Sequence, residues 1–192
     1  MAHATVFGKG NMGSAIAKLF ESAQYSVQVL DSSASADENI TGEIVVLAVP
    51  YAALSTIVDK FGKQLKGLTV VDITNPVDFS TMDSLLPAPD SSAAAELADI
   101  LPDSKVIKAF NTNFVGSLVS AKVGDNQTTV LIAGDDEEAK NELATVVKQA
   151  GLDAVDAGSL KRARELESFG FLQLALAVSG KLSFNGGFAV LK

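Results

Sequence analysis

The chain alternates short apolar runs with longer segments whose apolar residues recur at helical spacing. The short runs are rich in β-branched residues, which is typical of buried strands, and the longer segments predict amphipathic helices. Parallel neighbouring strands need a crossover of this length, whereas antiparallel neighbours can be joined by a turn of a few residues. The alternation therefore predicts an α/β fold built on a doubly wound parallel sheet.

The expected elements follow from where each pattern starts and stops. Strands are predicted at residues 4–7, 25–31, 43–50, 68–76, 105–111, 128–134 and 152–158, and helices from residue 12 and at 51–65, 93–101, 136–150 and 160–181. About a dozen residues separate the second strand from the third, so the crossover helix there should be truncated or absent. With 192 residues, 47% of them hydrophobic, the chain can bury one substantial core. We therefore expect one domain over residues 1–192, with 159–192 as C-terminal helix and tail.

Composition narrows the classes of partner. The formal net charge is −8 and the 15 Lys and Arg residues form no dense cluster, so neither a nucleic acid nor an anionic membrane is expected as a partner. The absence of cysteine excludes disulfides, thiolate nucleophiles and most structural zinc sites. The single histidine, His3, should be exposed, and no metal site is predicted. Without a signal segment or an apolar run of about 18 residues, a cytoplasmic protein with a small-molecule partner is expected.

Three glycines lie at the spacing G-x-G-x-x-G in VFGKGNMGSAIA, between the first strand and the first helix. Gly8 permits a tight turn, Gly10 lets a pyrophosphate approach the backbone, and Gly13 allows the helix to pack on the strand. The pyrophosphate would lie on the helix N-terminus near Asn11. Asp31 ends the second strand, where a carboxylate can accept hydrogen bonds from the adenosine ribose. The motif in this context predicts a Rossmann-type site for a nicotinamide dinucleotide.

Seven blocks of sequence carry a family resemblance that covers nearly the whole chain. They are GKGNMGSAIA, VVLAVPYAAL, VVDITNPVDF, SSAAAELADILP, KVIKAFNT, IAGDDEEAK and VDAGSLKRARELE. In this order they resemble the deazaflavin-dependent NADP reductase family, which passes hydride between a nicotinamide and an 8-hydroxy-5-deazaflavin. The chain is also similar to the cytoplasmic reductase domain of the six-transmembrane ferric reductases. The resemblance implies NAD(P)H as cofactor and a flavin or deazaflavin as second substrate.

The resemblance and the motif together name the expected site residues. The cofactor-binding set is Gly8, Lys9, Gly10, Asn11, Met12, Gly13, Asp31, Ser32, Ser33, Val49, Pro50, Tyr51, Asn75 and Pro76. The expected nicotinamide and acceptor region is Ala109, Phe110, Asn111, Thr112, Gly186, Gly187 and Phe188. Structural roles are the alternative for several of them, because Pro50 can start a helix, Asn75 and Pro76 can form an ordinary turn, and Asn111 can cap an element.

One departure from the family concerns the cofactor's 2′-phosphate. Family members commonly follow the second strand with a basic pair, whereas this chain has LDSSASADENITGE and no Lys or Arg from residue 19 through 59. The carboxylate of Asp31 would repel a 2′-phosphate, which favours NAD(H) over NADP(H). Lys9 and the hydroxyls of Ser32, Ser33 and Ser35 could offset that repulsion. Alternatively, Asp31 only caps the following turn.

Three functions remain open at this point. Hydride transfer between a nicotinamide and a flavin-like ring needs stacking and orientation more than a side-chain acid, and no catalytic acid or base is evident. Reduction of a carbonyl or imine needs a positioned proton donor, for which Tyr51 and a few Lys or Asp residues are the candidates. The first alternative is therefore a small imine or carbonyl reductase, similar to those of proline biosynthesis. The second is a non-catalytic NAD(P) sensor.

The last predicted helix is apolar around more of its circumference than one buried face requires. The apolar residues are Phe169, Phe171, Leu172, Leu174, Leu176 and Val178. A second surface should cover part of this helix. We therefore expect a homodimer formed through it, with complete burial under the C-terminal tail as the alternative.

Overall fold

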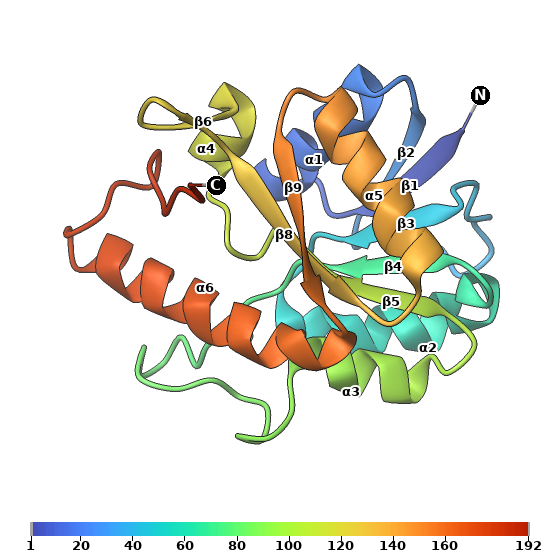
Figure 1. Ribbon diagram of the computed structural model, residues 1–192. Coiled ribbons are helices and arrows are strands. Elements are labelled where there is room, and N and C mark those ends of the chain that lie inside the picture. The colour runs from blue at the N-terminus through green and yellow to red at the C-terminus, as the bar shows by residue number, and fades with distance from the viewer. Residues whose placement is uncertain (1, 192) are drawn as a thin grey trace.

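A seven-stranded sheet organises the chain, which the computed structural model describes over residues 2–191 (Figure 1). The strand order is β2-β1-β3-β4-β5-β8-β9. These strands span His3–Phe7 (β1), Ser26–Leu30 (β2), Ile44–Leu47 (β3), Thr69–Asp72 (β4), Lys105–Lys108 (β5), Thr129–Gly134 (β8) and Asp153–Gly158 (β9). A separate hairpin pairs β6 (Lys122–Val123) with β7 (Asn126–Gln127). The predicted α/β fold with a doubly wound, mostly parallel sheet is confirmed.

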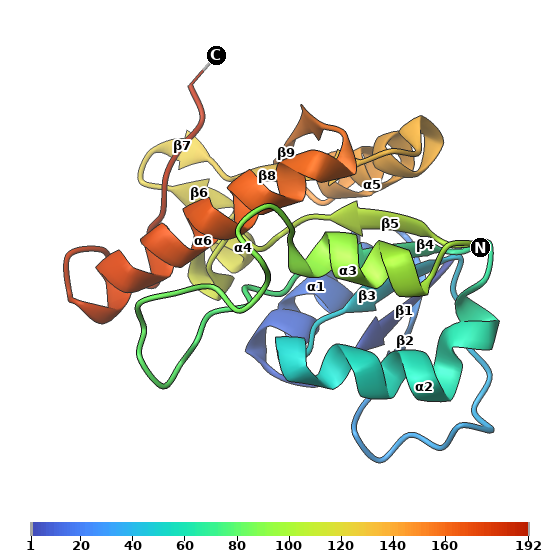
Figure 2. The same cartoon turned by 90° about the horizontal axis from the view of Figure 1, so that it is seen from below.

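Helices cover both faces of this sheet (Figures 1 and 2). They span Asn11–Ser22 (α1), Leu54–Leu65 (α2), Ala93–Ile100 (α3), Val115–Ser120 (α4), Glu137–Gln149 (α5) and Ala163–Val178 (α6), with 3-10 turns at Tyr51–Ala53 (η1) and Leu160–Arg162 (η2). Because successive strand residues face opposite sides, Val71 packs in the core under α1, α4 and α5, whereas Val70 packs in the core under α2 and α3. The sheet thus separates two hydrophobic cores.

The pairing directions differ from the expectation at one junction. β1, β2, β3, β4 and β5 pair in parallel, and β8 pairs in parallel with β9, but β5 and β8 are antiparallel. After β5 the chain forms α4 and the small hairpin, and it then enters β8 from the same end of the sheet at which β5 stopped. An antiparallel neighbour of this kind needs no crossover. The short α4 and the hairpin were not predicted, because six helical residues are too few to show a periodicity.

Other expectations about the elements hold in the structure. No crossover helix forms between β2 and β3, which are joined by an irregular segment. The predicted helix at 51–65 begins as the turn η1, and the predicted last helix divides into η2 and α6, which ends at Val178. Beyond α6, residues 179–191 double back toward α4 and the hairpin (Figure 1). Within residues 2–191, no helix is long and apolar enough to cross a membrane.

A fully buried ion cluster connects the sheet with α3 and α6. The Lys108 ammonium lies 2.8 Å from a carboxylate oxygen of Asp72 on β4 and 2.8 Å from one of Glu167 on α6, and it donates to the Thr74 carbonyl at 2.6 Å. Glu167 also accepts a hydrogen bond from the backbone N–H of Ala93 at the start of α3. Burial raises the pKa of Glu167, although Lys108 beside it favours the charged form. Each buried charge therefore has a partner of opposite sign.

We predict that Lys108→Met lowers the free energy of unfolding by about 3–5 kcal/mol, because it leaves two carboxylates buried without their cation. Lys105→Met on the same strand is the matched control. Lys105 is partly exposed and lies 3.6 Å from its carboxylate partners, so its loss should cost less than about 1 kcal/mol. Urea denaturation measures both, and equal small losses would contradict the proposed role of Lys108.

Candidate functional site

The glycine loop between β1 and α1 is shaped by two of its three glycines. Gly8 has a φ of +115°, which L side chains rarely adopt, and a Cβ there would lie 2.1 Å from the Ala48 carbonyl oxygen. A Cβ on Gly13 would lie 2.1 Å from the Gly8 carbonyl oxygen. These two glycines are therefore required by the packing of the loop against β3 and α1.

Gly10 has a different reason to be glycine. Its φ of −70° suits any residue, and a Cβ built on it meets no atom within 4 Å. Gly10 is also the N-cap of α1, where no side chain caps the helix. The first N–H groups of a helix and its positive dipole end favour an anion, and the missing Cβ leaves open space above them. The loop therefore fits the pyrophosphate of a dinucleotide.

A cavity of about 420 Å³ lies on one side of this loop, at the carboxyl ends of β1, β2 and β3. Its walls include the predicted Lys9, Asp31, Ser32, Val49 and Pro50. It also includes Lys60 of α2, which sequence reasoning missed because Lys60 is 29 positions beyond Asp31 in the chain. Its position corresponds to the adenosine half of a dinucleotide bound at the edge where these strands end.

Asp31 is already engaged in this cavity. One carboxylate oxygen lies 2.6 Å from the Lys9 ammonium, and the other accepts hydrogen bonds from the Ser33 N–H at 2.8 Å and the Ser33 hydroxyl at 2.5 Å. The hydrogen bond from Lys9, followed by those from Ser33, holds the pKa of Asp31 well below its usual range. The carboxylate therefore stays ionised, and both expected roles, turn cap and charged group facing the cavity, coexist in one side chain.

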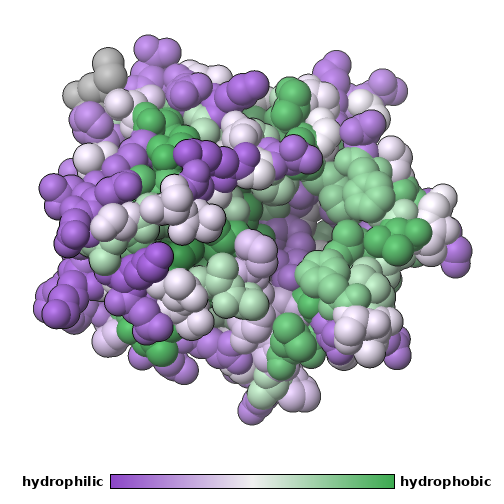
Figure 3. All heavy atoms as spheres, turned by 180° about the vertical axis from the view of Figure 1, so that it is seen from behind, coloured by the Kyte–Doolittle hydropathy of each residue, from purple (hydrophilic) through white to green (hydrophobic). Residues whose placement is uncertain are grey.

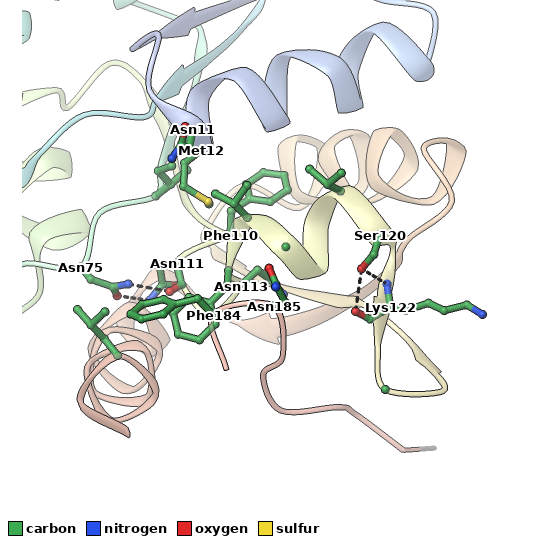
Figure 4. A pocket seen from close by; sticks show the side chains of 17 residues that line it. Asn11, Met12, Asn75, Phe110, Asn111, Asn113, Ser120, Lys122, Phe184 and Asn185 are labelled. Carbon is green, nitrogen blue, oxygen red and sulfur yellow. Dashed lines mark hydrogen bonds between the residues drawn. The ribbon is translucent and has the colours of Figure 1, made fainter. Parts of the chain in front are cut away.

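A larger cavity of about 1030 Å³ lies on the other side of the glycine loop (Figure 4). Asn11 and Met12 of α1 line it together with Asn75, Phe110 and Asn111, which follow β4 and β5. The sequence predicts Asn11, Met12 and Asn75 in the cofactor-binding set and Phe110 and Asn111 in the nicotinamide and acceptor region, and all five line this one cavity. The loop 8–13 therefore separates two hollows at the same edge of the sheet, as the two halves of a dinucleotide require.

Two asparagines form part of the wall of this larger cavity. The Asn75 side chain donates to the Asn111 carbonyl at 2.8 Å, and the Asn111 amide nitrogen donates to the Asn75 side-chain oxygen at 2.9 Å and to the Leu166 carbonyl at 2.8 Å. A Cβ on Gly170 of α6 would lie 2.4 Å from that Asn75 oxygen. Gly170 therefore lets α6 approach the pair, and Asn111 links the strand ends to this helix.

Phe110 holds a rare backbone conformation beside this pair. Its φ is +61°, and the Asn111 N–H donates to the Ala109 carbonyl at 2.8 Å, which together describe a γ-turn centred on Phe110. The ring is fully buried among α1, α4 and α5. A bulky residue in this region is strained by roughly 1–3 kcal/mol. Such strain persists where the surrounding packing fixes the turn, and here the turn places Asn111.

Several predicted residues lie away from the two cavities. Tyr51 donates its hydroxyl to Glu96 on α3, and burial followed by Glu96 raises the pKa of Tyr51 to about 12. Pro76, Ala109 and Thr112 contribute backbone turns or core packing instead of cavity wall. In the tail, Phe188 packs on Phe169 with ring centroids 5.1 Å apart. Gly186, Gly187 and Phe188 are not among the residues that line the larger cavity.

The tail nevertheless reaches the larger cavity through residues that the sequence did not single out. Phe184 and Asn185 line it (Figure 4), together with Asn113, Phe114 and Gly116 around the start of α4. No sequence signal identified them, because α4 itself was not predicted. Among residues 2–191 there is no group of three or more His, Cys, Asp and Glu side chains that could hold a metal ion.

Comparisons with known proteins agree with this geometry. A family model described as 3-hydroxyacyl-CoA dehydrogenase, NAD binding domain, matches residues 3–77, the segment from β1 through β4. The F420-dependent NADP reductase of Methanocaldococcus jannaschii is 30% identical over 149 residues, which are 76% of this chain and 66% of that protein. The protein of the same name from Methanothermobacter marburgensis is 28% identical over 181 residues, covering 90% and 80%.

Other matches extend the similarity. Metalloreductase STEAP3 of Rattus norvegicus is 33% identical over 129 residues, which are 66% of this chain but 24% of that protein. The chain thus spans just under two thirds of the length of the Methanocaldococcus relative and a quarter of the rat protein. A structure from Arthrobacter sp. FB24, described as a candidate F420-dependent NADP reductase, superposes with a TM-score of 0.86 at 24% identity, covering 98% of this chain and 99% of the other.

An imine reductase from Myxococcus stipitatus shares the fold with a TM-score of 0.66 at 17% identity, and the match covers 94% of this chain and 63% of that protein. The resemblance indicated by the seven sequence blocks is confirmed by the curated relatives, and that to the ferric reductases by the rat metalloreductase. The chain belongs to the family of the F420-dependent NADP reductases, with a Rossmann-type NAD(P)-binding domain.

Proposed function

We propose that this protein is an NAD(P)H-dependent oxidoreductase that transfers hydride between a nicotinamide dinucleotide and a flavin-like or deazaflavin ring. The observation that carries the proposal is the pair of cavities of about 420 and 1030 Å³ on either side of Gly10. The smaller suits an adenosine, and the larger has room for a nicotinamide and a second ring. The names of the curated relatives support the same activity.

The residues of this chain would hold the dinucleotide along the edge where the strands end. The open N-terminus of α1 at Gly10 would bind the pyrophosphate, and Asn75 and Asn111 would border the nicotinamide. When bound, the reduced nicotinamide supplies a hydride, which is one proton and two electrons, to the ring stacked on it. The apolar walls around Met12, Phe110 and Phe114 would exclude water from that contact.

The larger cavity has little to offer as a proton donor. Among the described residues that line it, only Lys122 carries an ionisable side chain, and Lys122 lies exposed on the hairpin. Tyr51, the donor considered from the sequence, lines a different hollow with Glu96, and its pKa of about 12 makes its hydroxyl a weak acid. Hydride transfer between two rings needs orientation more than a side-chain acid, so the cavity suits a ring acceptor.

A second candidate function is the reduction of an imine. It is favoured by structural neighbours described as imine reductases and as a pyrroline carboxylate reductase, with TM-scores of 0.66 and 0.57. These neighbours are 17% and 13% identical to this chain, so they share the fold. Among residues 2–191, no carboxylate or tyrosine that would protonate an imine lines the larger cavity. A non-catalytic NAD(P) sensor would bind the dinucleotide without turning it over.

We predict that the purified protein oxidises NADH or NADPH in the presence of a deazaflavin or a flavin, followed by the loss of absorbance of the reduced nicotinamide. Quinones, ferric chelates and small cyclic imines are tested in parallel. Turnover of imines alone would establish the second candidate function instead. Tight binding of the dinucleotide without turnover of any acceptor would identify a sensor.

We further propose that Asp31 biases the site toward NADH, and we predict that NADPH binds about fivefold more weakly or worse. The 2′-phosphate adds roughly two negative charges beside this carboxylate, and Lys9 offsets them only in part because it already pairs with Asp31. Asp31→Ser should remove the difference between the dissociation constants. A native preference for NADPH would overturn the assignment and indicate that Lys9 and Lys60 decide the selectivity.

The pH dependence of this preference follows from the two groups that face each other. Because the pKa of Asp31 lies well below its usual range, the carboxylate stays ionised from pH 8 down to pH 5. A phosphate monoester takes up a proton near pH 6, so its repulsion from Asp31 weakens below that pH. The ratio of NADPH to NADH dissociation constants should therefore shrink between pH 8 and pH 5.5 in the native protein. It should not shrink in Asp31→Ser, where the charged groups that face the phosphate are the cations Lys9 and Lys60.

We predict that Gly10→Ala and Gly13→Ala separate binding from folding. A Cβ on Gly10 meets nothing in the protein, so its thermal stability should be unchanged while dinucleotide affinity falls about tenfold, because the methyl group blocks the pyrophosphate. A Cβ on Gly13 meets the Gly8 carbonyl, so Gly13→Ala should lower the melting temperature. Thermal melts and binding titrations measure both, and unchanged affinity in Gly10→Ala would place the pyrophosphate elsewhere.

We also propose that α6 forms a homodimer interface. Leu172 and Val178 of α6 and Phe184 of the tail remain exposed by 52%, 59% and 52%. In the view from behind, apolar side chains also border a hollow in the surface (Figure 3). A second copy of the helix would cover such a surface. Sedimentation at micromolar concentration should show a dimer that Leu172→Glu converts to a monomer. Ile100→Glu on α3, equally exposed, is the control, and a native monomer would refute the dimer.

A further inference from the structure

We propose that the side-chain oxygen of Asn113 accepts a hydrogen bond from a ring N–H of the hydride acceptor, and so selects planar heteroaromatic rings that carry such a group. The proposal rests on the proposed function, which supplies a ring acceptor, and it names the residue that recognises that ring. Asn113 lines the larger cavity with Phe114 and the tail residue Asn185 (Figure 4).

The first observation is a buried acceptor atom without a partner. The Asn113 side-chain oxygen is shielded from solvent and forms no hydrogen bond with any described residue. The orientation of this amide is fixed, because its nitrogen donates to the Thr129 carbonyl at 3.0 Å, where an oxygen would be repelled. A buried carbonyl oxygen without a donor is costly. A ligand that displaces the atoms covering this oxygen and supplies an N–H would therefore gain that hydrogen bond.

The second observation is an apolar wall in the cavity that Asn113 also lines. The rings of Phe114 and Phe184 lie with centroids 5.2 Å apart, and both line the cavity together with Val119. Aromatic walls of this kind favour the face of a planar ring. An apolar wall in the same cavity as one unpaired acceptor suits a fused ring with an N–H group on its edge.

The third observation explains how the tail is held at the cavity. A Cβ on Gly116 of α4 would lie 2.3 Å from the Asn185 side-chain oxygen and 2.7 Å from the Asn185 Cα. Only glycine at this position lets the tail pack against α4, and that packing brings Phe184 to Phe114. The acceptor subsite of Asn113, Phe114, Phe184 and Asn185 therefore depends on Gly116.

A required hydrogen bond from a ring N–H distinguishes classes of acceptor that the volume of the cavity alone does not distinguish. An isoalloxazine or deazaisoalloxazine ring carries an imide N–H at position N3, whereas a naphthoquinone or a ferric chelate of carboxylates presents no such donor. Methylation of N3 removes the donor and leaves the redox-active part of the ring in place. Riboflavin and N3-methylriboflavin are therefore a matched pair of probes, and menadione is a probe without any N–H.

The experiment measures kcat/KM of the native protein for these three acceptors at saturating reduced dinucleotide. Methylation of N3 should lower kcat/KM about tenfold or more, as expected when a buried acceptor loses its donor. Equal values for riboflavin and N3-methylriboflavin would overturn the proposal while leaving hydride transfer to a ring acceptor intact.

Two variants at one position isolate the oxygen atom. Asn113→Leu and Asn113→Asp both lose the hydrogen bond to the Thr129 carbonyl, but only Asn113→Asp keeps an oxygen that accepts an N–H. The penalty for N3 methylation should disappear in Asn113→Leu and persist in Asn113→Asp. If it persists in both, a different acceptor such as the unpartnered Asn111 oxygen reads the ring, and the assignment to Asn113 is wrong.

Gly116→Ala tests the dependence on the tail. It should raise the KM for riboflavin several-fold without changing the dissociation constant of the dinucleotide, because the added Cβ displaces Asn185. Gly62→Ala in α2 is the matched control, since a Cβ there lies no closer than 3.4 Å to a neighbour and faces neither cavity. An unchanged KM in Gly116→Ala would show that the tail does not form the subsite.

A binding measurement covers the case in which no acceptor is turned over. Riboflavin and N3-methylriboflavin are titrated by calorimetry into the native protein saturated with oxidised dinucleotide. Selective binding of riboflavin without turnover would support the role of Asn113 and refute the proposed oxidoreductase activity. Equal binding of the two probes, or binding of neither, would overturn the role of Asn113.

Discussion

The buried ammonium of Lys108 determines where the helices can lie on the sheet. It is held between Asp72 on β4 and Glu167 on α6, and Glu167 in turn accepts the N–H of Ala93 at the start of α3. A charge removed from water is stable only with such partners, so α6 cannot shift along the sheet without leaving an uncompensated charge. This one cluster therefore fixes α6 against the sheet, next to the strand ends where the larger cavity opens.

The position of α6 has direct consequences for the cavity. Because α6 is held close, Gly170 meets the Asn75 and Asn111 pair, and the Leu166 carbonyl accepts from Asn111. Asn111 is also held from its other side by the γ-turn at Phe110, whose buried ring locks a backbone conformation that would otherwise relax. Two independent constraints thus leave Asn111 a single position. A site held in this way needs no rearrangement when a ring arrives, which is what transfer over a short fixed distance requires.

Local signals account for what the sequence could predict. The glycine loop was predictable because close contacts within one strand, turn and helix leave no room for a Cβ on Gly8 or Gly13. The missing crossover helix followed from the length of the segment between β2 and β3. Lys60, by contrast, comes to the cavity that Asp31 lines only through the packing of α2. The tail residues that line the cavity, Phe184 and Asn185, are set by the contact of Gly116 with Asn185, and the expected residues 186–188 follow them directly in the chain.

The two cavities present different chemical groups, and this difference bears on the proposed reaction. The smaller cavity presents the charges of Asp31, Lys9 and Lys60. These charges would distinguish a dinucleotide with a 2′-phosphate from one without it. On the acceptor side, the described lining offers amides, aromatic rings and the exposed Lys122. A buried carboxylic acid there would be held neutral by desolvation and could protonate a substrate. Uncharged amide oxygens in that place would orient a ring through its N–H groups but would not protonate it, so in the proposed reaction the proton that accompanies the hydride would come from solvent or from the exposed Lys122.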